Sequence, residues 1–220
     1  MQESFNHEKD AIQSKLVTIG ENLLKANELI LDGLSACDKE KFLEARNFVK
    51  NIISKTDEID NEIVQVLGLN TYEGEELRTL VAYLKITNEF VRASANTRSF
   101  IRGFAGICGQ IDNSKIKDYT IPMQRSTIKA VRLALAMMSI DDSEELQECY
   151  DEIIIEESKT DDLYEMVEKN LFIQAAKSDE FEKFHKMLKA LRKSEKIADR
   201  ATSIANLLLY IKVGGNFHQV

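Results

Sequence analysis

The chain has 220 residues, of which 44% are hydrophobic and 30% are charged, and its formal net charge is −8. This composition is typical of an ordinary globular protein with one sizeable core or two small ones. The acidic balance argues against nucleic-acid binding, because neutralising phosphates supplies most non-specific affinity. No apolar run approaches the roughly 20 residues of a bilayer-spanning helix, and the polar, acidic N-terminus is unlike a signal peptide. We therefore expect a cytoplasmic protein with no nucleic-acid partner and no membrane insertion.

The cysteines at positions 37, 108 and 149 are widely spaced and form no C-x-x-C pair. This pattern argues against a disulfide framework and against a thiolate zinc site. We expect reduced thiols.

Apolar residues at helical spacing predict three helices in the first half, over about 5–37, 38–67 and 77–104. Asp38 suits the N-cap of the second helix. The glycines at 103, 106 and 109 mark the midpoint of the chain.

The second half predicts three more helices, from Pro122 to about 138, from about 142 to 171, and from about 179 to Gly214. A proline fits the first turn of a helix, so we place Pro122 there. Only one proline and no tryptophan occur in the whole chain. All of these features favour an all-α fold.

The two halves repeat each other. The tetrapeptide Ser54–Asp57 recurs as Ser158–Asp161, 104 residues later. The same offset, without gaps, also aligns residues of three successive helices: Leu29 with Leu133, Asp38 with Asp142, Glu44 with Glu148, and Leu84 with Leu188. We predict a tandem repeat of two antiparallel three-helix bundles, with one repeat in 1–112 and the other in 113–220.

Two carboxylates interrupt the apolar face of the last helix. Phe184, Leu188 and Leu191 share that face, and the helical period continues it to Glu195 and Asp199. Groups four residues apart lie roughly 5–6 Å from each other, and two negative charges at that distance on a buried face repel each other and resist desolvation. This pattern predicts a cation between them.

The repeat sharpens this prediction, because the first copy lacks most of the acids. The offset aligns Glu157 with Ile53, Asp161 with Asp57, Glu195 with Val91, and Asp199 with Ala95. Oxygen ligands favour Mg, Mn, Ca or Fe over a thiolate-type zinc site. Pairing of Glu195 and Asp199 with Lys or Arg on a neighbouring helix is the alternative reading.

The segment Ser194–Asn206 reads Ser-Glu-Lys-Ile-Ala-Asp-Arg-Ala-Thr-Ser-Ile-Ala-Asn and resembles the Glu/Asp-x-x-x-Asp helix of the PhoU family. The resemblance implies the same tandem architecture. It also implies that acidic helices bind metal ions such as Fe or Zn, in addition to the Mn and Mg that oxygen ligands favour. Carried over by position, the ligands are Glu157, Asp161, Glu195 and Asp199, and Glu156 and Asp162 are neighbours that could substitute. Val91 and Ala95 depart from the family motif, which leaves only a weaker, displaced site at Glu89 and Asp57 in the first copy.

The resemblance also implies a function. PhoU proteins are cytoplasmic signalling adaptors and negative regulators of phosphate uptake and the phosphate-starvation response, and they act by binding rather than as enzymes. The implied partners are the ATPase subunit of a phosphate ABC importer and the phosphate-sensing histidine kinase. The resemblance leaves room for a homodimer.

Two other readings compete with this one. A ferritin-like oxidase needs paired Glu-x-x-His motifs, whereas the chain has a single one at Glu182–His185. A generic helical interaction module without metal is the second alternative.

The last helix also carries a basic stripe on another face, made of Lys186, Lys189, Arg192, Lys193, Lys196 and Arg200. Such a stripe either docks an acidic partner surface or is a solvated face that pairs locally with glutamates.

Overall fold

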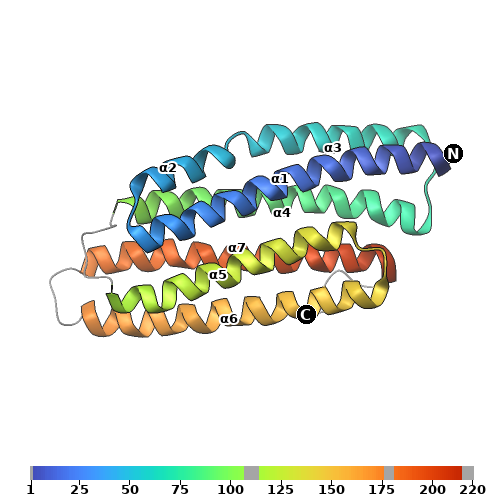
Figure 1. Cartoon of the computed structure of the whole chain (residues 1–220). Helices are drawn as coiled ribbons and strands as arrows, with labels where there is room; N and C mark the ends of the chain where they lie inside the picture. The colour runs from blue at the N-terminus through green and yellow to red at the C-terminus, as the bar shows by residue number, and fades with distance from the viewer. Residues whose placement is uncertain (1, 107–113, 176–180, 215–220) are drawn as a thin grey trace.

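The computed structural model describes residues 2–106, 114–175 and 181–214, and within these ranges it contains helices and no strand (Figure 1). The helices are α1 (Gln2–Ala36), α2 (Lys39–Phe48), α3 (Ile52–Leu69), α4 (Gly74–Ala105), α5 (Ser114–Ala136), the 3-10 turn η1 (Met137–Ser139), α6 (Ser143–Ala175) and α7 (Phe181–Val213). None of the described helices is long and apolar enough to cross a membrane.

The helices form two antiparallel bundles that lie side by side, one of α1, α2–α3 and α4 and the other of α5, α6 and α7 (Figure 1). The predicted all-α tandem fold is therefore confirmed. Equivalent helices of the two copies meet, since α1 packs on α5 and α4 packs on α7. Glu28 and Arg132, which are themselves 104 residues apart, form an ion pair at 2.9 Å, as expected near an approximate twofold axis. The division at 112/113 falls outside the described residues and stays a prediction.

The second predicted helix is broken, which corrects the single helix expected over 38–67. Helix α2 ends at Phe48, and α3 begins at Ile52 after Asn51, whose φ of 56° lies in the left-handed region. Asparagine is one of the few residues that adopts this conformation readily. Apolar residues continue across the break, because Val49 and Ile52 are both buried, so the hydrophobic period alone did not reveal it.

Helix α5 begins at Ser114, so Pro122 lies inside it rather than in its first turn. This corrects the predicted start. A proline inside a helix removes one backbone hydrogen bond, and packing against α6, α7 and α1 supports this helix.

Equivalent aspartates cap the equivalent helices α2 and α6. The Asp38 carboxylate accepts a hydrogen bond from the Glu40 N–H at 2.9 Å, and the Asp142 carboxylate accepts from the N–H groups of Glu144 and Glu145. These contacts satisfy amide donors that have no partner within the helix. The predicted cap at Asp38 is confirmed.

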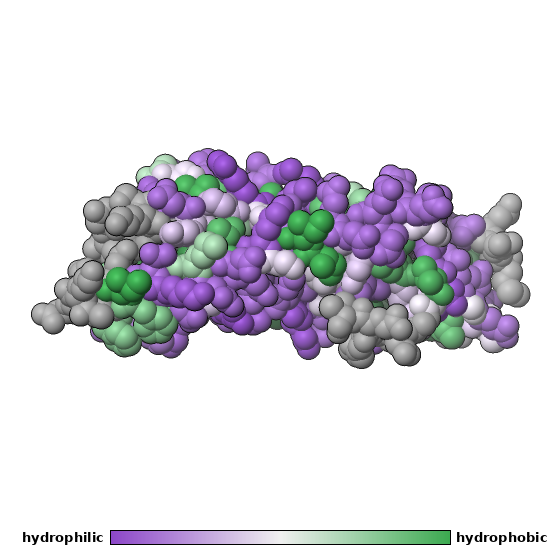
Figure 2. Space-filling model, turned by 90° about the horizontal axis from the view of Figure 1, so that it is seen from below, coloured by the Kyte–Doolittle hydropathy of each residue, from purple (hydrophilic) through white to green (hydrophobic). Residues whose placement is uncertain are grey.

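Glycines allow close approach where the two bundles meet. A Cβ at Gly20 of α1 would lie 2.0 Å from Leu135 Cδ2 of α5, and a Cβ at Gly103 of α4 would lie 2.9 Å from Ala190 Cβ of α7. The core is continuous across both bundles, from Leu16 and Phe90 to Leu191. The face of the molecule that is seen from below in Figure 2 is mainly hydrophilic, and its apolar residues form separate patches.

The cysteines differ from expectation at one position. Cys37 is disulfide-bonded, so the expectation of reduced thiols is wrong for this residue, whereas Cys149 is free. Cys108 lies outside the described residues. Wide spacing along the sequence does not keep cysteines apart in space, because distant segments of a bundle pack together.

Candidate cation site

Helices α6 and α7 pack side by side and bring three of the four predicted carboxylates together. Oxygen atoms of Glu157, Asp161 and Asp199 all lie within 4.8 Å of one another. Glu157 and Asp199 are half-buried, and Asp161 is exposed. Glu157 and Asp161 are four residues apart on α6, so they share one helix face, and Asp199 faces them from α7. Among the described residues, this is the one group of acids with such geometry.

The fourth predicted residue, Glu195, is not a member of this group. It is buried, with only 3% of its surface exposed, and its Oε1 lies 3.2 Å from Arg192 and 3.6 Å from Lys196. Its Oε2 is buried and has no hydrogen-bond partner. Burial, reinforced by the neighbouring charge of Asp199, raises the pKa of Glu195 to about 7.

Nearby cations neutralise part of the site. Lys196 Nζ lies 2.9 Å from Asp199 Oδ2, and Arg200 Nη2 lies 3.5 Å from the same oxygen. Glu157 and Asp161, in contrast, form no ion pair with any described residue. Burial, together with the charges of Asp161 and Asp199, raises the pKa of Glu157. Glu195 and Asp199 therefore do pair with cations, but these cations lie on α7 itself and not on a neighbouring helix as the alternative expected. Neither of the two α6 carboxylates forms such a pair with a described residue.

The neighbouring acids on α6 do not join the group. Glu156 is buried and pairs with Lys159 at 2.8 Å and Lys129 at 3.1 Å. Burial opposes its ionisation, but hydrogen bonds from Lys159, Ser126 and Lys129 outweigh burial and lower the pKa of Glu156. Asp162 is exposed. Glu156 is thus a partner of α5 rather than a substitute ligand.

A buried polar network lies behind Glu195, and the sequence reasoning missed it. The Gln124 amide donates to the backbone and side-chain oxygens of Asn27 at 3.2 and 3.1 Å, and it accepts from Ser194 Oγ at 2.6 Å. Thr127 Oγ1 lies 3.1 Å from Ser194 Oγ. All four side chains are almost fully buried. The network joins α1, α5 and α7 and fixes the rotation of α7 beside the acidic group; Ser194 directly before Glu195 was its one signal in the sequence.

Arg200 was also missed as a site residue, and it links the two bundles. Its Nη1 lies 3.0 Å from Glu89 Oε2 on α4, while its Nη2 contacts Asp199. Glu89 therefore serves as an ion-pair partner of the second copy. Asp57, its predicted companion in a displaced site, is exposed and does not appear in any acidic group of the described residues.

The equivalent positions of the first copy offer a single carboxylate. Val91 and Ala95 are half-buried on α4, and Ile53 is 56% exposed on α3. Asp57 remains the one carboxylate among these four positions, so the first copy lacks the donor set of the second.

The Glu182-x-x-His185 motif lies away from the acidic group. Glu182 pairs with Lys186 at 2.7 Å, and the His185 ring stacks on Phe181 with a centroid distance of 6.0 Å. Neither side chain belongs to the acidic group. The donors that are assembled are carboxylate oxygens alone, which suit hard or borderline cations.

Fold and site together define a class of protein, an all-helical tandem bundle with an acidic cluster between two helices of its second copy. Residues 121–208 match the family model described as the PhoU domain. This match covers most of the second copy, and the resemblance to the PhoU family that Ser194–Asn206 indicated is confirmed.

The solved structures that the chain resembles carry the same fold. The crystal structure of PhoU from Pseudomonas aeruginosa matches with a TM-score of 0.84 at 19% identity, over 96% of this chain and 100% of that one. The phosphate transport system regulatory protein PhoU from Streptococcus pneumoniae matches with a TM-score of 0.80 at 14% identity, over 96% and 98% of the two chains. A putative PhoU-like phosphate regulatory protein from Shewanella oneidensis MR-1 matches with a TM-score of 0.64 at 14% identity, over 91% and 95%. A search of curated proteins finds no match.

Proposed function

We propose that this protein is a cytoplasmic regulator of phosphate uptake and phosphate-starvation signalling that works by binding other proteins. The match of its second copy to the PhoU domain and the name of the similar Streptococcus protein support this role. The proposed partners are the ATPase subunit of a phosphate ABC importer and the phosphate-sensing histidine kinase. Catalysis plays no part in this proposal, and the acidic group serves to hold a cation.

The observation that carries the cation proposal is the meeting of three carboxylates from two helices within 4.8 Å. Two of them, Glu157 and Asp161, have no cationic partner among the described residues. Like charges at this distance are costly unless a cation offsets them. Glu157, Asp161 and Asp199 would bind Fe, Mn, Mg or Zn directly, and Glu195 lies beside them as a fourth carboxylate.

The cation would act by joining α6 to α7. Helix α7 also packs on α4 of the first copy, and Arg200 connects Asp199 to Glu89. A cation that holds α6 against α7 would therefore fix the relative placement of the two bundles and the surface offered to partners. Because it binds only the folded arrangement, it would also stabilise that arrangement.

The first test is metal quantification on protein purified without chelators or affinity tags. We expect the double variant Asp161→Asn with Asp199→Asn to remove the bound metal, because it loses two ligands. We expect the same of Glu195→Ala with Asp199→Ala, which loses one ligand and the adjacent carboxylate. The matched control, Asp57→Asn with Asp162→Asn, also removes two carboxylates and should leave the metal content unchanged. Undiminished metal in the Asp161→Asn and Asp199→Asn variant would disprove the site.

The second test is co-purification with the ATPase subunit of the importer. We expect capture by the wild-type protein and weaker capture by the Asp161→Asn and Asp199→Asn variant, since that variant lacks the cation that joins α6 to α7. Equal capture by both proteins would separate partner binding from metal binding and would leave the metal a purely structural role. Absence of capture by either protein would favour a generic helical module.

A further inference from the structure

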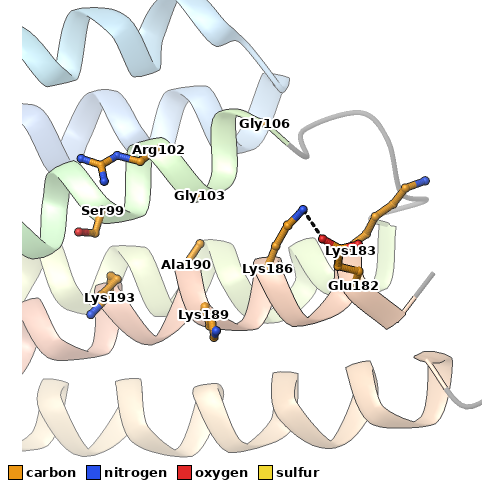
Figure 3. Close-up of a pocket in the computed structure, with 10 residues that line it drawn as sticks. All are labelled: Ser99, Arg102, Gly103, Gly106, Glu182, Lys183, Lys186, Lys189, Ala190 and Lys193. Atoms are coloured by element: carbon orange, nitrogen blue, oxygen red, sulfur yellow. Dashed lines mark ion pairs between the residues drawn. The ribbon is translucent and has the colours of Figure 1, made fainter.

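A basic groove runs between the C-terminal half of α4 and the N-terminal half of α7, on a part of the molecule distinct from the acidic group. Its volume is about 580 Å³, within the range of roughly 300–1,000 Å³ that is usual for small-molecule sites. Ser99 and Arg102 extend from α4, and the facing residues come from α7 (Figure 3). The residues that matter here are Ser99, Arg102, Lys186, Lys189, Ala190 and Lys193.

The groove concentrates positive charge in an acidic protein. Five cationic side chains and one carboxylate line it, although the whole chain carries a net charge of −8. The carboxylate, Glu182, pairs with Lys186 at 2.7 Å (Figure 3). Arg102, Lys189 and Lys193 form no ion pair with any described residue. These three cations therefore lack a counter-charge within the described part of the chain.

The basic stripe of the last helix thus divides into two sets. Lys186, Arg192, Lys196 and Arg200 pair with carboxylates of α7 or α4. Lys189 and Lys193 are among the residues that line the groove, and they have no such partners among the described residues. Local pairing with glutamates, one of the two readings of the stripe, explains the first set only.

The repeat shows that the charge is not a general property of this helix contact. The 104-residue offset aligns Lys193 with Glu89, Lys186 with Ala82, and Arg102 with Asn206, whereas Lys189 aligns with another cation, Lys85. Four of the five cations of the groove therefore have neutral or negative equivalents, since Lys183 aligns with Thr79. Positive charge that is concentrated at one of two equivalent helix contacts favours a ligand at that contact.

The shape of the groove selects an extended anion. Its floor is set by Gly103 and Ala190, where a Cβ on the glycine would lie only 2.9 Å from the alanine Cβ. Its α7 wall runs from Lys183 to Lys193, which is about 15 Å of helix at roughly 1.5 Å per residue. A single orthophosphate contacts few of the cations spread over that length, whereas a chain of phosphoryl groups contacts more of them at once. Arginine binds phosphate oxygens in pairs, and lysine binds them as a point charge.

We propose that the groove between α4 and α7 binds a linear oligophosphate anion, the chemistry shared by inorganic tripolyphosphate and the triphosphate of a nucleotide. This inference is independent of the proposed cation site. That site lies beside Lys196 and Arg200, whereas the groove is lined by Lys186, Lys189 and Lys193. A docking site for an acidic protein segment is the competing assignment. The limited volume of the groove favours the small anion, since protein interfaces cover roughly 800 Å² on each partner.

The test is calorimetric titration of chelator-treated protein at low salt with tripolyphosphate, ATP and orthophosphate. We expect saturable binding of tripolyphosphate and ATP, weakening as salt is added, and at least tenfold weaker binding of orthophosphate. Equal affinity for tripolyphosphate and ATP would assign recognition to the phosphate chain, and tighter binding of ATP would assign the ligand as a nucleotide.

Variants locate the binding. Arg102→Gln with Lys193→Gln should weaken tripolyphosphate binding about tenfold or more, because each charged hydrogen bond that is lost is worth about a factor of ten. The matched control, Arg46→Gln with Lys50→Gln, removes the same two charge types from exposed positions on the first bundle and should bind normally. The single substitution Lys189→Gln, at an exposed position, should weaken tripolyphosphate binding several-fold. It provides a second measurement of the groove's contribution if the double variant folds poorly.

The results that would overturn the proposal are equally specific. They are absence of saturable binding at low salt, equal weakening in the control variant, or binding of a glutamate-rich peptide by a protein that does not bind tripolyphosphate. The Asp161→Asn and Asp199→Asn variant should bind tripolyphosphate as the wild-type protein does, so failure of the cation site and failure of the groove are distinguishable.

Discussion

Two regions of this protein share one backbone arrangement and differ in chemistry. In the second copy, Glu157, Asp161 and Asp199 come together between α6 and α7. At three of the four equivalent positions of the first copy stand Ile53, Val91 and Ala95. The same helix contact therefore exists with and without the acids, which means that the fold does not require them.

The difference extends behind the acids. Gln124 and Ser194 form a hydrogen bond in the second copy. The equivalent positions of the first copy hold Gly20 and Phe90. These two residues also face each other, since a Cβ on Gly20 would lie 3.2 Å from Phe90 Cζ. The contact is retained while its chemistry changes from apolar to polar. A buried polar network must be fully satisfied to be tolerated, so the second copy carries a constraint that the first lacks.

The largest expected effect comes from breaking that network. Gln124→Leu leaves the oxygen of buried Asn27 and one side of Ser194 without partners, and each unsatisfied buried group costs about 1–3 kcal/mol. We expect the free energy of unfolding to fall by about 4 kcal/mol in urea denaturation. Gln147→Leu, at an exposed position of α6, should change it by less than about 0.5 kcal/mol. A small effect of Gln124→Leu would show that the polar and apolar versions are equally stable.

The next effect is a pH dependence that comes from Glu195 of the second copy and has no equivalent at Val91 of the first. Folding raises the pKa of Glu195 from 4.5 to about 7. Between these values the unfolded chain is ionised at this residue while the folded protein is protonated, so the stability of the metal-free protein falls as pH rises from about 4.5 to 7. The loss corresponds to about 3 kcal/mol.

Glu195→Gln removes this loss, because the amide cannot ionise. We expect the variant to be more stable than the metal-free wild type by about 3 kcal/mol at pH 8 and equal to it near pH 4. Urea denaturation of chelator-treated protein across this range provides the measurement. Val91→Thr, at the equivalent position of the first copy, should show a difference from wild type that does not vary with pH. A pH-independent effect of Glu195→Gln would contradict the raised pKa.

The sequence predicted the fold and the identity of the acids better than it predicted their surroundings. Hydrophobic period and a single offset were enough for the tandem bundles, because both report which face each helix buries. The break at Asn51 escaped because apolar residues continue across it, and the start of α5 was misplaced because Pro122 was assigned to a first turn. The partners of Glu195 and Asp199 were expected on a neighbouring helix, yet they lie on α7 at spacings that the helical period alone indicates. The pair of Arg200 with Glu89 could not be predicted, because it depends on how α7 is placed against α4.

The smallest effect concerns Lys196, which occupies the place beside Asp199 that a metal ion would use. Its Nζ lies 2.9 Å from Asp199 Oδ2 and 3.6 Å from Glu195 Oε1, so it repels an incoming cation and competes for the same oxygen. Removing a partly exposed charge of this kind is worth about 1 kcal/mol. We therefore expect Lys196→Gln to raise the affinity for Mn²⁺ about fivefold in calorimetric titration of chelator-treated protein.

The control is Arg92→Gln. Arg92 is the equivalent of Lys196 in the first copy and lies 3.8 Å from the carboxylate of Glu89, yet its replacement should leave the Mn²⁺ affinity unchanged. Weaker Mn²⁺ binding in Lys196→Gln would mean that the lysine itself is the counter-charge that the acids of the second copy require.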